Sequence, residues 1–326
     1  MAHGEPCRIV LTRALPGPLM DLLHGAAACV VNPDDRNWPP DEIVGAARAH
    51  AANVLLVMAM DRIDATLIAA LPDSMQVIAT FSVGHDHIDL AAAQARGLAV
   101  LSTPDVLSDA VADMGMLLLL GAARRAREAM QLLYAGAWTG WSPTQLIGRD
   151  LSGGRLGIVG MGRIGRAIAR RAKHGFGMAI HYNNRSRLTA ELEDGATFHP
   201  ELDSLLAVSD FLMLAAPSTP STRGLLSRSA ISKLPPGAVV ANVSRGDLVD
   251  DAALIQALGT GRVMAAGLDV FNNEPAIHPG YLALPNLFLQ PHQGSSTIET
   301  RLRMGTALLD SIMRVRAGAP VPSRLV

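Results

Sequence analysis

Short apolar runs alternate with alanine-rich amphipathic segments along the first hundred residues of the chain. The apolar runs are rich in Val, Ile and Leu, and they predict β-strands at residues 8–12, 28–32, 53–59, 76–82 and 98–103. The segments between them carry apolar residues at helical spacing, and they predict helices at residues 17–25, 40–50, 64–72 and 89–97. Strands and helices that alternate in this way form βαβ units, so we expect a parallel sheet.

The same alternation returns in a more regular form between residues 155 and 292. Strands are predicted at residues 155–160, 178–183, 211–217, 238–244, 263–271 and 287–292, helices at 163–175, 201–209 and 250–261, and a last helix at 297–318. We therefore predict an α/β protein with two doubly wound parallel-sheet domains. Because the C-terminal segment is free to return to the first domain, we expect residues 104–291 to be inserted into a domain of residues 1–103 plus 292–326.

Residues 108–133 lie between the two regions and are apolar over most of the helix circumference as far as Arg124. The pattern predicts one long helix that is buried on several sides, either in the core or between domains or subunits. The irregular segment 134–150, which contains Trp138 and Trp141, follows it. We expect a homodimer in which residues 108–133 and 134–150 lie near the interface.

The composition excludes several kinds of partner. Of the 326 residues, 49% are hydrophobic and 17% are charged, and the net charge of −1 provides no basic field for nucleic acid or for an anionic membrane. The longest apolar runs are shorter than the roughly 20 residues that a transmembrane helix needs, and the start of the chain lacks the pattern of a signal peptide. Cys7 and Cys29 could form a disulfide, but two reduced thiols in a cytoplasmic protein are the simpler interpretation.

The strand predicted at residues 155–160 leads into the sequence GMGRIG, and a predicted helix follows. A GxGxxG motif between a strand and a helix is typical of a dinucleotide-binding loop. Gly160 would allow the tight turn, Gly162 would let the backbone approach a pyrophosphate, and Gly165 would let the helix pack closely on the strand. The expected cofactor-binding residues of this loop are Gly160, Met161, Gly162, Arg163, Ile164 and Gly165.

The next strand ends in HYNNRSR, where an NAD site would place an Asp or Glu against the ribose 2′-hydroxyl. A carboxylate there would repel the 2′-phosphate of NADP, whereas Arg185 and Arg187 would attract it. Asn184 and Ser186 can donate hydrogen bonds to the same group. The pattern favours NADPH over NADH, and a solvated basic loop is the alternative interpretation.

Four stretches, GRLGIVGMGRIGRAIARR, NVSRGDLVDDAALIQAL, AAGLDVFNNEP and LPNLFLQPHQGSST, carry a resemblance to a known family. Over nearly its whole length the chain resembles the D-isomer-specific 2-hydroxyacid dehydrogenases. The stretches NRSR and WTGWSP make it most similar to the NADPH-dependent glyoxylate/hydroxypyruvate reductases among them. The resemblance implies a Rossmann cofactor domain inserted into a flavodoxin-like substrate domain, and the reduction of small 2-keto acids to D-2-hydroxy acids by hydride from NADPH.

The resemblance also implies a role for individual residues. Arg245 would bind the substrate carboxylate, and His292 would protonate the carbonyl oxygen. Glu274 would hydrogen-bond the imidazole and favour its charged form, and Asp269 would lie near the nicotinamide. The chemistry agrees, because a planar guanidinium suits a carboxylate and a protonated His is a competent acid near neutral pH. The further residues that the resemblance implies are Val83 and Gly84 for the substrate carboxylate and Pro217, Val243, Ser244 and Gly294 for the cofactor.

The chain departs from the family pattern at two places. Gln293 follows His292 where the family usually has Ile, and His85-Asp86-His87 follows Gly84 where the family usually has Tyr-Asp-Asn. These changes leave the substrate open: a larger 2-keto acid such as 2-ketogluconate is one alternative, and phosphite oxidation also occurs on this scaffold. A non-catalytic NAD(P)-sensing protein, similar to the corepressors of the family, is an alternative from another class. Adjacent loop residues rarely hold a metal ion, so we expect no metal site at His85 and His87.

Overall fold

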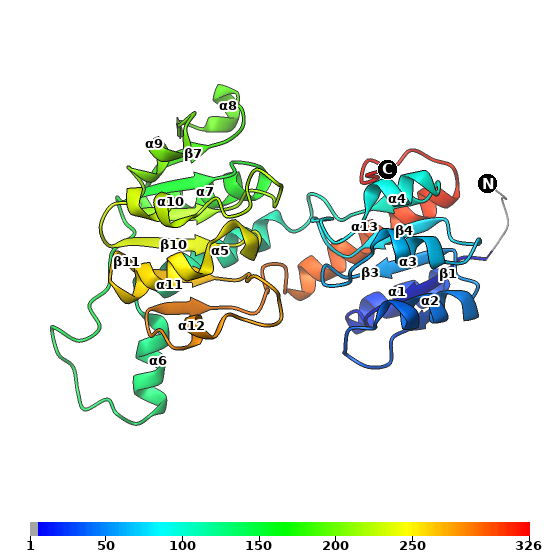
Figure 1. The fold of residues 1–326 in the computed structure, drawn as a ribbon, viewed down its shortest axis with the longest axis horizontal. Coiled ribbons are helices and arrows are strands. Elements are labelled where there is room, and N and C mark those ends of the chain that lie inside the picture. Colours follow the sequence, from blue (N-terminus) through cyan, green and yellow to red (C-terminus); the bar gives the residue numbers. More distant parts are fainter. Residues whose placement is uncertain (1–5) are drawn as a thin grey trace. The chain divides into compact units, whose positions relative to one another are not determined.

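The computed structural model describes residues 6–326. The chain divides into two compact units, one made of the residues up to Leu107 together with Ser295–Val326 and the other of Ser108–Gly294. Each unit is an α/β structure with its own sheet (Figure 1).

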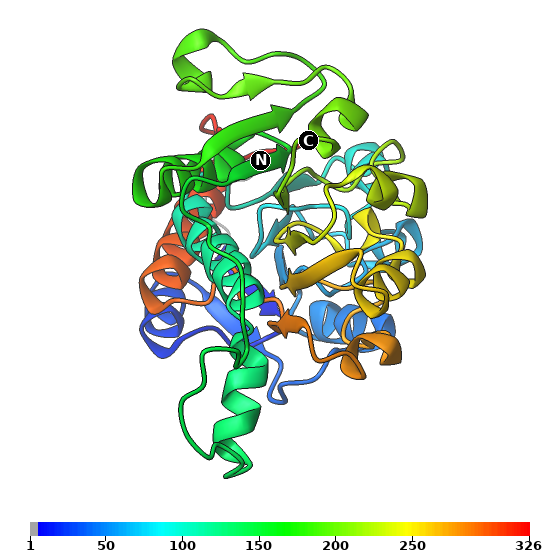
Figure 2. The same ribbon diagram turned by 90° about the vertical axis from the view of Figure 1, so that its left-hand side faces the viewer.

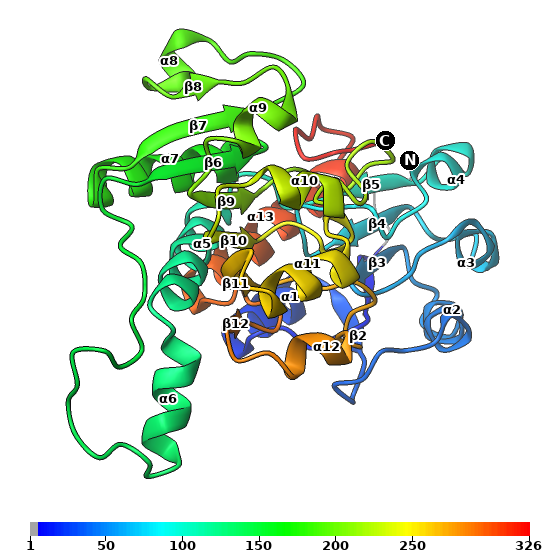
Figure 3. The same ribbon diagram turned by 60° about the vertical axis from the view of Figure 1, so that its left-hand side comes forward.

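The first unit contains a five-stranded sheet in the order β2-β1-β3-β4-β5, and every pairing in it is parallel. Its strands are β1 (Arg8–Leu11), β2 (Ala28–Val31), β3 (Val54–Val57), β4 (Val77–Thr80) and β5 (Ala99–Leu101). Its helices are α1 (Gly17–Ala26), α2 (Pro40–Ala49), α3 (Ala65–Ala70), α4 (Leu90–Ala95) and α13 (Ile298–Arg316). The apolar residues of β1, β3, β4 and β5 are buried on both faces, because α2, α3 and α4 line one face of the sheet and α1 and α13 the other (Figure 3).

The second unit contains a seven-stranded parallel sheet in the order β12-β11-β10-β9-β6-β7-β8. Its strands are β6 (Arg155–Val159), β7 (Ala179–Asn183), β8 (Thr197–Phe198), β9 (Phe211–Leu214), β10 (Ala238–Asn242), β11 (Val263–Leu268) and β12 (Leu287–Leu289). Its helices are α5 (Ser108–Ala123), α6 (Ala126–Tyr134), α7 (Arg163–Phe176), α8 (Ala190–Glu193), α9 (Leu202–Leu206), α10 (Arg228–Lys233), the 3₁₀ helix η1 (Gly246–Leu248), α11 (Asp251–Gly259) and α12 (Pro279–Leu282).

The predicted fold class is confirmed, because both sheets are parallel and doubly wound. The first sheet has the flavodoxin-like order, and the second has the order of a dinucleotide-binding Rossmann sheet. In the second unit the chain moves from β6 outward to β7 and β8 and then returns to β9 on the other side of β6. Open sheets bind ligands at such a reversal, outside the carboxyl ends of the strands.

The prediction of one helix over residues 108–133 was wrong, because the structure has α5 and α6 there. Arg125 interrupts the helix with a left-handed φ of 54°. In a continuous helix the carbonyl of Ala123 would accept the N–H of Arg127, but here it accepts the N–H of Arg149 at 2.9 Å. The returning segment at Gly148 and Arg149 therefore ends α5.

The second unit runs from Ser108 to Gly294, so it starts four residues later and ends three residues later than the expected 104–291. Asp269, which follows β11, explains the later C-terminal end. It accepts the backbone N–H groups of Gln293 and Gly294 at 2.7 and 2.8 Å, and its carbonyl accepts the N–H of His292 at 2.8 Å. These three bonds attach His292 and the two residues after it to the seven-stranded sheet.

Candidate active site

The loop after β6 contains the first predicted binding motif. Gly160 has a φ of 93°, a conformation that favours glycine. A Cβ at this position would lie only 2.5 Å from the backbone nitrogen of Ala216, which follows β9. The loops after β6 and β9 therefore approach each other closely at the reversal of the sheet, and only glycine allows this approach.

The N-terminus of α7 has the features of an anion site. Gly162 is its N-cap and makes no side-chain capping bond, so the first N–H groups of this 14-residue helix have no partner within the helix. A Cβ on Gly162 would meet open space, whereas a Cβ on Gly165 would lie 2.2 Å from the carbonyl oxygen of Gly160. The helix packs tightly on the loop but is open where a pyrophosphate would bind, so the residues present fit a dinucleotide.

The end of β7 offers amides and a basic loop. The side-chain oxygen of Asn184 accepts the N–H of Met161 at 2.7 Å and so joins the loops after β7 and β6. Arg185, Ser186 and Arg187 are exposed. The cofactor residues predicted in these two loops therefore lie together at one edge of the second unit.

A carboxylate does lie near the basic loop, and the sequence analysis missed it. Glu193, at the end of α8, binds Arg187 through two hydrogen bonds of 2.8 and 3.1 Å. The buried hydroxyl of Tyr182 donates to the same carboxylate at 2.6 Å and accepts the N–H of Leu188 at 3.0 Å. The Arg187 guanidinium and the Tyr182 hydroxyl lower the pKa of Glu193, which is therefore charged at neutral pH. The only signal in the sequence was an acid six residues beyond Arg187.

The turn after β10 positions Arg245. The fully buried Asn242 accepts the N–H of Ser244 at 2.9 Å and donates to the carbonyl of Arg245 at 2.8 Å. The Ser244 hydroxyl donates to the carbonyl of Ala216. At the next residue, Gly246, a Cβ would lie 1.9 Å from the backbone of Phe271. The Arg245 turn is thereby packed against the segment that carries Glu274.

His292 and Glu274 form a hydrogen-bonded pair, with 2.7 Å between Nδ1 of the imidazole and Oε2 of the carboxylate. The other oxygen of Glu274 accepts the N–H of Phe271 at 2.7 Å. His292 itself has a φ of 55°, a conformation that is uncommon outside glycine and that concentrates at functional sites. The structure therefore brings two of the three predicted catalytic residues into direct contact and places Arg245 at the end of β10, two strands from His292.

Asp269 lies at the end of β11, between the strands that precede Arg245 and His292. It is almost completely buried, and this burial raises the pKa of its carboxyl to about 6, although two backbone N–H donors and the nearby His292 favour the charged form. The side chain of Gln293 is exposed, so the departure from the family pattern at this position leaves the backbone bond to Asp269 in place. Of the other predicted cofactor residues, Pro217 follows β9, Val243 is buried after β10 and Gly294 is bound to Asp269.

Val83 and Gly84 belong to the first unit and follow β4. A chain of hydrogen bonds shapes their turn: the Ser82 hydroxyl donates to the carbonyl of Gly84 at 2.6 Å and lies 2.7 Å from the hydroxyl of Thr80. Nε2 of His87 lies 3.0 Å from the same Thr80 hydroxyl. His87, which departs from the family pattern, thus supports the turn through its contact with Thr80. His85 is exposed.

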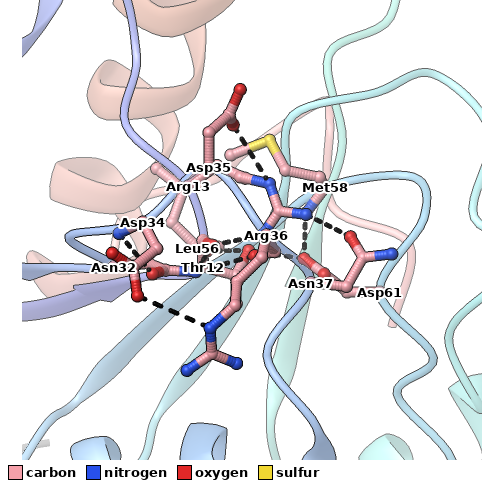
Figure 4. Close-up of polar contacts among 10 residues, drawn as sticks. All are labelled: Thr12, Arg13, Asn32, Asp34, Asp35, Arg36, Asn37, Leu56, Met58 and Asp61. Carbon is pink, nitrogen blue, oxygen red and sulfur yellow. Dashed lines mark hydrogen bonds and ion pairs between the residues drawn. The ribbon is translucent and has the colours of Figure 1, made fainter.

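A second polar cluster lies at the same edge of this sheet, after β1, β2 and β3 (Figure 4). The buried Asp61 accepts the N–H of Met58 at 2.7 Å and the hydroxyl of Thr12, and Asn32 donates to the carbonyl of Thr12 at 3.0 Å. These bonds fix the loop after β3 against the end of β1. Among residues 6–326 no three His, Cys, Asp or Glu side chains are arranged to hold a metal ion, and Cys7 and Cys29 are free thiols. No helix in this part of the chain is long and apolar enough to cross a membrane.

Comparison with known proteins identifies the class. Residues 116–294 match the family model of the D-isomer specific 2-hydroxyacid dehydrogenase, NAD binding domain. The chain belongs to the D-isomer-specific 2-hydroxyacid dehydrogenase family, and it is an oxidoreductase that acts with a nicotinamide cofactor. The resemblance seen in the sequence is thereby confirmed.

Individual relatives cover nearly the whole chain. It is 41% identical to the glycerate dehydrogenase of Hyphomicrobium methylovorum, over 96% of this chain and 97% of that one. A solved structure of a Polaromonas protein assigned to the same family has a TM-score of 0.94 and 49% identity, over 99% and 100% of the two chains. The NADPH-dependent glyoxylate/hydroxypyruvate reductase of Sinorhizobium meliloti, solved with NADP and malonate, has a TM-score of 0.84 and 32% identity, over 99% and 97%.

Proposed function

We propose that this protein reduces glyoxylate and hydroxypyruvate to D-2-hydroxy acids with NADPH. The observation that carries the proposal is the contact between His292 and Glu274 at the edge of the sheet where the Arg245 turn also lies. The names of the relatives from Hyphomicrobium and Sinorhizobium agree with this substrate class.

In this proposal Arg245, His292 and Glu274 each have one role. Arg245 binds the substrate carboxylate with its planar guanidinium. Because Nδ1 of His292 faces Glu274, Nε2 is the nitrogen that donates the proton to the carbonyl oxygen. The Glu274 carboxylate is hydrogen-bonded to Nδ1 and so keeps the imidazole oriented. When bound, the cofactor supplies the hydride.

The preference for NADPH rests on the end of β7, where Asn183 and Asn184 stand in place of a carboxylate and are followed by Arg185, Ser186 and Arg187. We propose that these residues bind the 2′-phosphate. The test is a kinetic comparison of NADPH and NADH for the unmodified enzyme and for an Arg185→Gln/Arg187→Gln variant. The variant should raise KM for NADPH by about 10–100-fold and change KM for NADH little, because a charge-assisted phosphate contact contributes about 1.5–3 kcal/mol. An unmodified enzyme that uses both cofactors equally well would contradict the preference.

A panel of 2-keto acids tests the substrate class in the same assay. Glyoxylate and hydroxypyruvate should have higher kcat/KM values than 2-ketogluconate, 4-methyl-2-oxopentanoate and phenylpyruvate. A preference for 2-ketogluconate would favour the larger-substrate alternative, and a preference for phenylpyruvate would contradict the proposal. Binding of NADPH without turnover of any acid would favour a nucleotide-sensing protein.

We also propose a cytoplasmic homodimer. Large apolar side chains are exposed on α6 and on the segment after it, which project away from the sheet of the second unit (Figure 2). We call these residues the arm patch: Met130, Leu133, Tyr134, Trp138, Trp141 and Ile147. An exposed apolar patch of this kind marks an interaction site, and a second copy of the chain is the partner that we infer.

A further inference from the structure

The basic loop after β7 is fixed from its inner side by a buried acid. Glu193 is 6% exposed, and both of its oxygens are hydrogen-bonded, one to Tyr182 and to Nε of Arg187 and the other to Nη2 of Arg187. We propose that Glu193 is a positioning residue for cofactor selectivity, which holds the Arg187 guanidinium in the orientation that receives the 2′-phosphate of NADPH. This inference rests on the NADPH preference proposed above.

The geometry leaves one part of the guanidinium for a ligand. Glu193 engages Nε and Nη2 side by side, at 2.8 and 3.1 Å, so Nη1 and the outer N–H of Nη2 remain for a second anion. The side chain of Arg187 is 67% exposed, whereas that of Glu193 is 7% exposed. The cation therefore has the solvent-facing position and the carboxylate the buried one.

This arrangement decides between two opposite effects of an acid near a phosphate site. A carboxylate that faced the ligand would repel the phosphate. The Glu193 carboxylate instead faces three donor groups, two on Arg187 and one on Tyr182. A long arginine side chain loses rotamer freedom when it binds a ligand, and this loss is smaller when the side chain is already held. Positioning should therefore outweigh repulsion.

The hydroxyl of Tyr182 extends the same support to the backbone of the loop. It donates to Glu193 and accepts the N–H of Leu188, the residue after Arg187. Arg185 is exposed and, within residues 6–326, forms no ion pair. The loop thus contains one arginine that a carboxylate holds and one that no carboxylate holds, and the held one depends on Glu193.

The experiment measures dissociation constants of NADPH and NADH by calorimetry, and KM and kcat for both, in Glu193→Gln. Gln keeps the shape but loses the charge, and its amide group cannot accept the second N–H of Arg187. We expect Kd and KM for NADPH to rise about tenfold, the effect of weakening one charge-assisted contact, while kcat and the NADH constants change less than about twofold. Unchanged or tighter NADPH binding would overturn the proposal.

Three matched variants separate positioning from other effects. Glu191→Gln removes the same charge from the exposed side of α8 and should leave NADPH binding unchanged; an equal loss there would show that general electrostatics, not positioning, is responsible. Glu193→Gln added to Arg187→Gln should have no further effect, and an additional tenfold loss would overturn the proposal. Tyr182→Phe should weaken NADPH binding in the same direction, and an unchanged constant would contradict the role of the hydroxyl. The unmodified enzyme's own ratio of NADPH to NADH binding tests the underlying preference separately.

Discussion

His292 combines an unfavourable backbone conformation with the proposed role of proton donor. A left-handed φ at a non-glycine residue costs on the order of 1 kcal/mol or more and persists where the surroundings determine it. Here the N–H of His292 is bound by the carbonyl of Asp269, and its imidazole is bound by Glu274. With this backbone conformation the ring lies against Glu274. The free-energy cost of the left-handed φ is therefore part of what it takes to form the His292–Glu274 pair.

The first prediction concerns this pair. Reduction needs a proton donor at the carbonyl oxygen, and in the proposal Nε2 of His292 is that donor while Glu274 holds Nδ1. Glu274→Gln keeps the shape but removes the charge from this hydrogen bond, so kcat should fall about tenfold or more. His292→Ala should lower kcat about 10²–10⁴-fold while leaving NADPH binding largely intact. Steady-state kinetics measure both, and an unchanged kcat in Glu274→Gln would show that Glu274 does not position the acid.

At this scale the sequence predicts the residues that would do the chemistry but not the residues that support them. Arg245, Glu274 and His292 each lie within a motif, and motifs are read along the chain. Asn242 and Glu193 act only through the residues that they contact in the fold. Asn and Glu are also common in turns and at helix ends, so neither residue stands out in the sequence. For the same reason the HYNNRSR loop was described without a carboxylate. The fold places Glu193 of α8 against Arg187 of this loop.

At the scale of elements, α5 lies directly on β11 because the strand has no side chain at the point of contact. A Cβ on Gly267 would lie 2.4 Å from the carbonyl oxygen of Leu118 and 2.8 Å from its Cβ. The obstacle is helix backbone, which cannot rotate away. The close approach explains why α5 is apolar on the faces that contact β10, β11 and α7.

The second prediction follows from this contact. Gly267→Ala should destabilise the protein by about 1–3 kcal/mol, the usual effect of overpacking. Gly175→Ala, inside α7, is the matched control, because its Cβ would meet nothing within 4 Å. That change should be neutral or stabilising by up to about 1 kcal/mol. Chemical denaturation measures both, and equal effects of the two substitutions would contradict the packing argument.

The spacing of apolar residues predicted the existence and type of most helices and strands. It failed where a segment distant in the sequence decides where a helix ends. The helical pattern of residues 108–133 runs through Arg124 and Arg125, and nothing local ends it. The helix ends there because Arg149, from the returning segment, takes the carbonyl of Ala123. Short elements such as β8 and α12 were also missed, since two to four residues are too few to show a period.

At the scale of the whole molecule, each unit places its predicted functional residues at the carboxyl ends of its parallel strands. The order of the strands in each sheet decides which loops become neighbours, and the sequence supplies the residues of those loops. The rule agrees with the resemblance to the family, which implied that residues as distant as Gly160 and Pro217 bind one cofactor. The arm patch does not follow the rule, because it lies on α6 and the segment after it, away from the strands (Figure 3).

The last prediction concerns that patch and the dimer. No residue of α6 is buried, and an isolated helix of nine residues is marginal in water, so α6 needs a partner surface to be stable. Trp141 is 82% exposed and Tyr134 is 85% exposed, so the protein should sediment as a dimer at micromolar concentration, with these side chains covered. Leu133→Glu should weaken the dimer at least tenfold, because it places a charge in an apolar contact. Leu22→Glu, on α1, is the matched control, since Leu22 is 50% exposed and Leu133 is 59% exposed. Analytical ultracentrifugation of the three proteins decides the matter: a monomeric unmodified protein, or equal effects of the two substitutions, would show that the arm patch is not the interface.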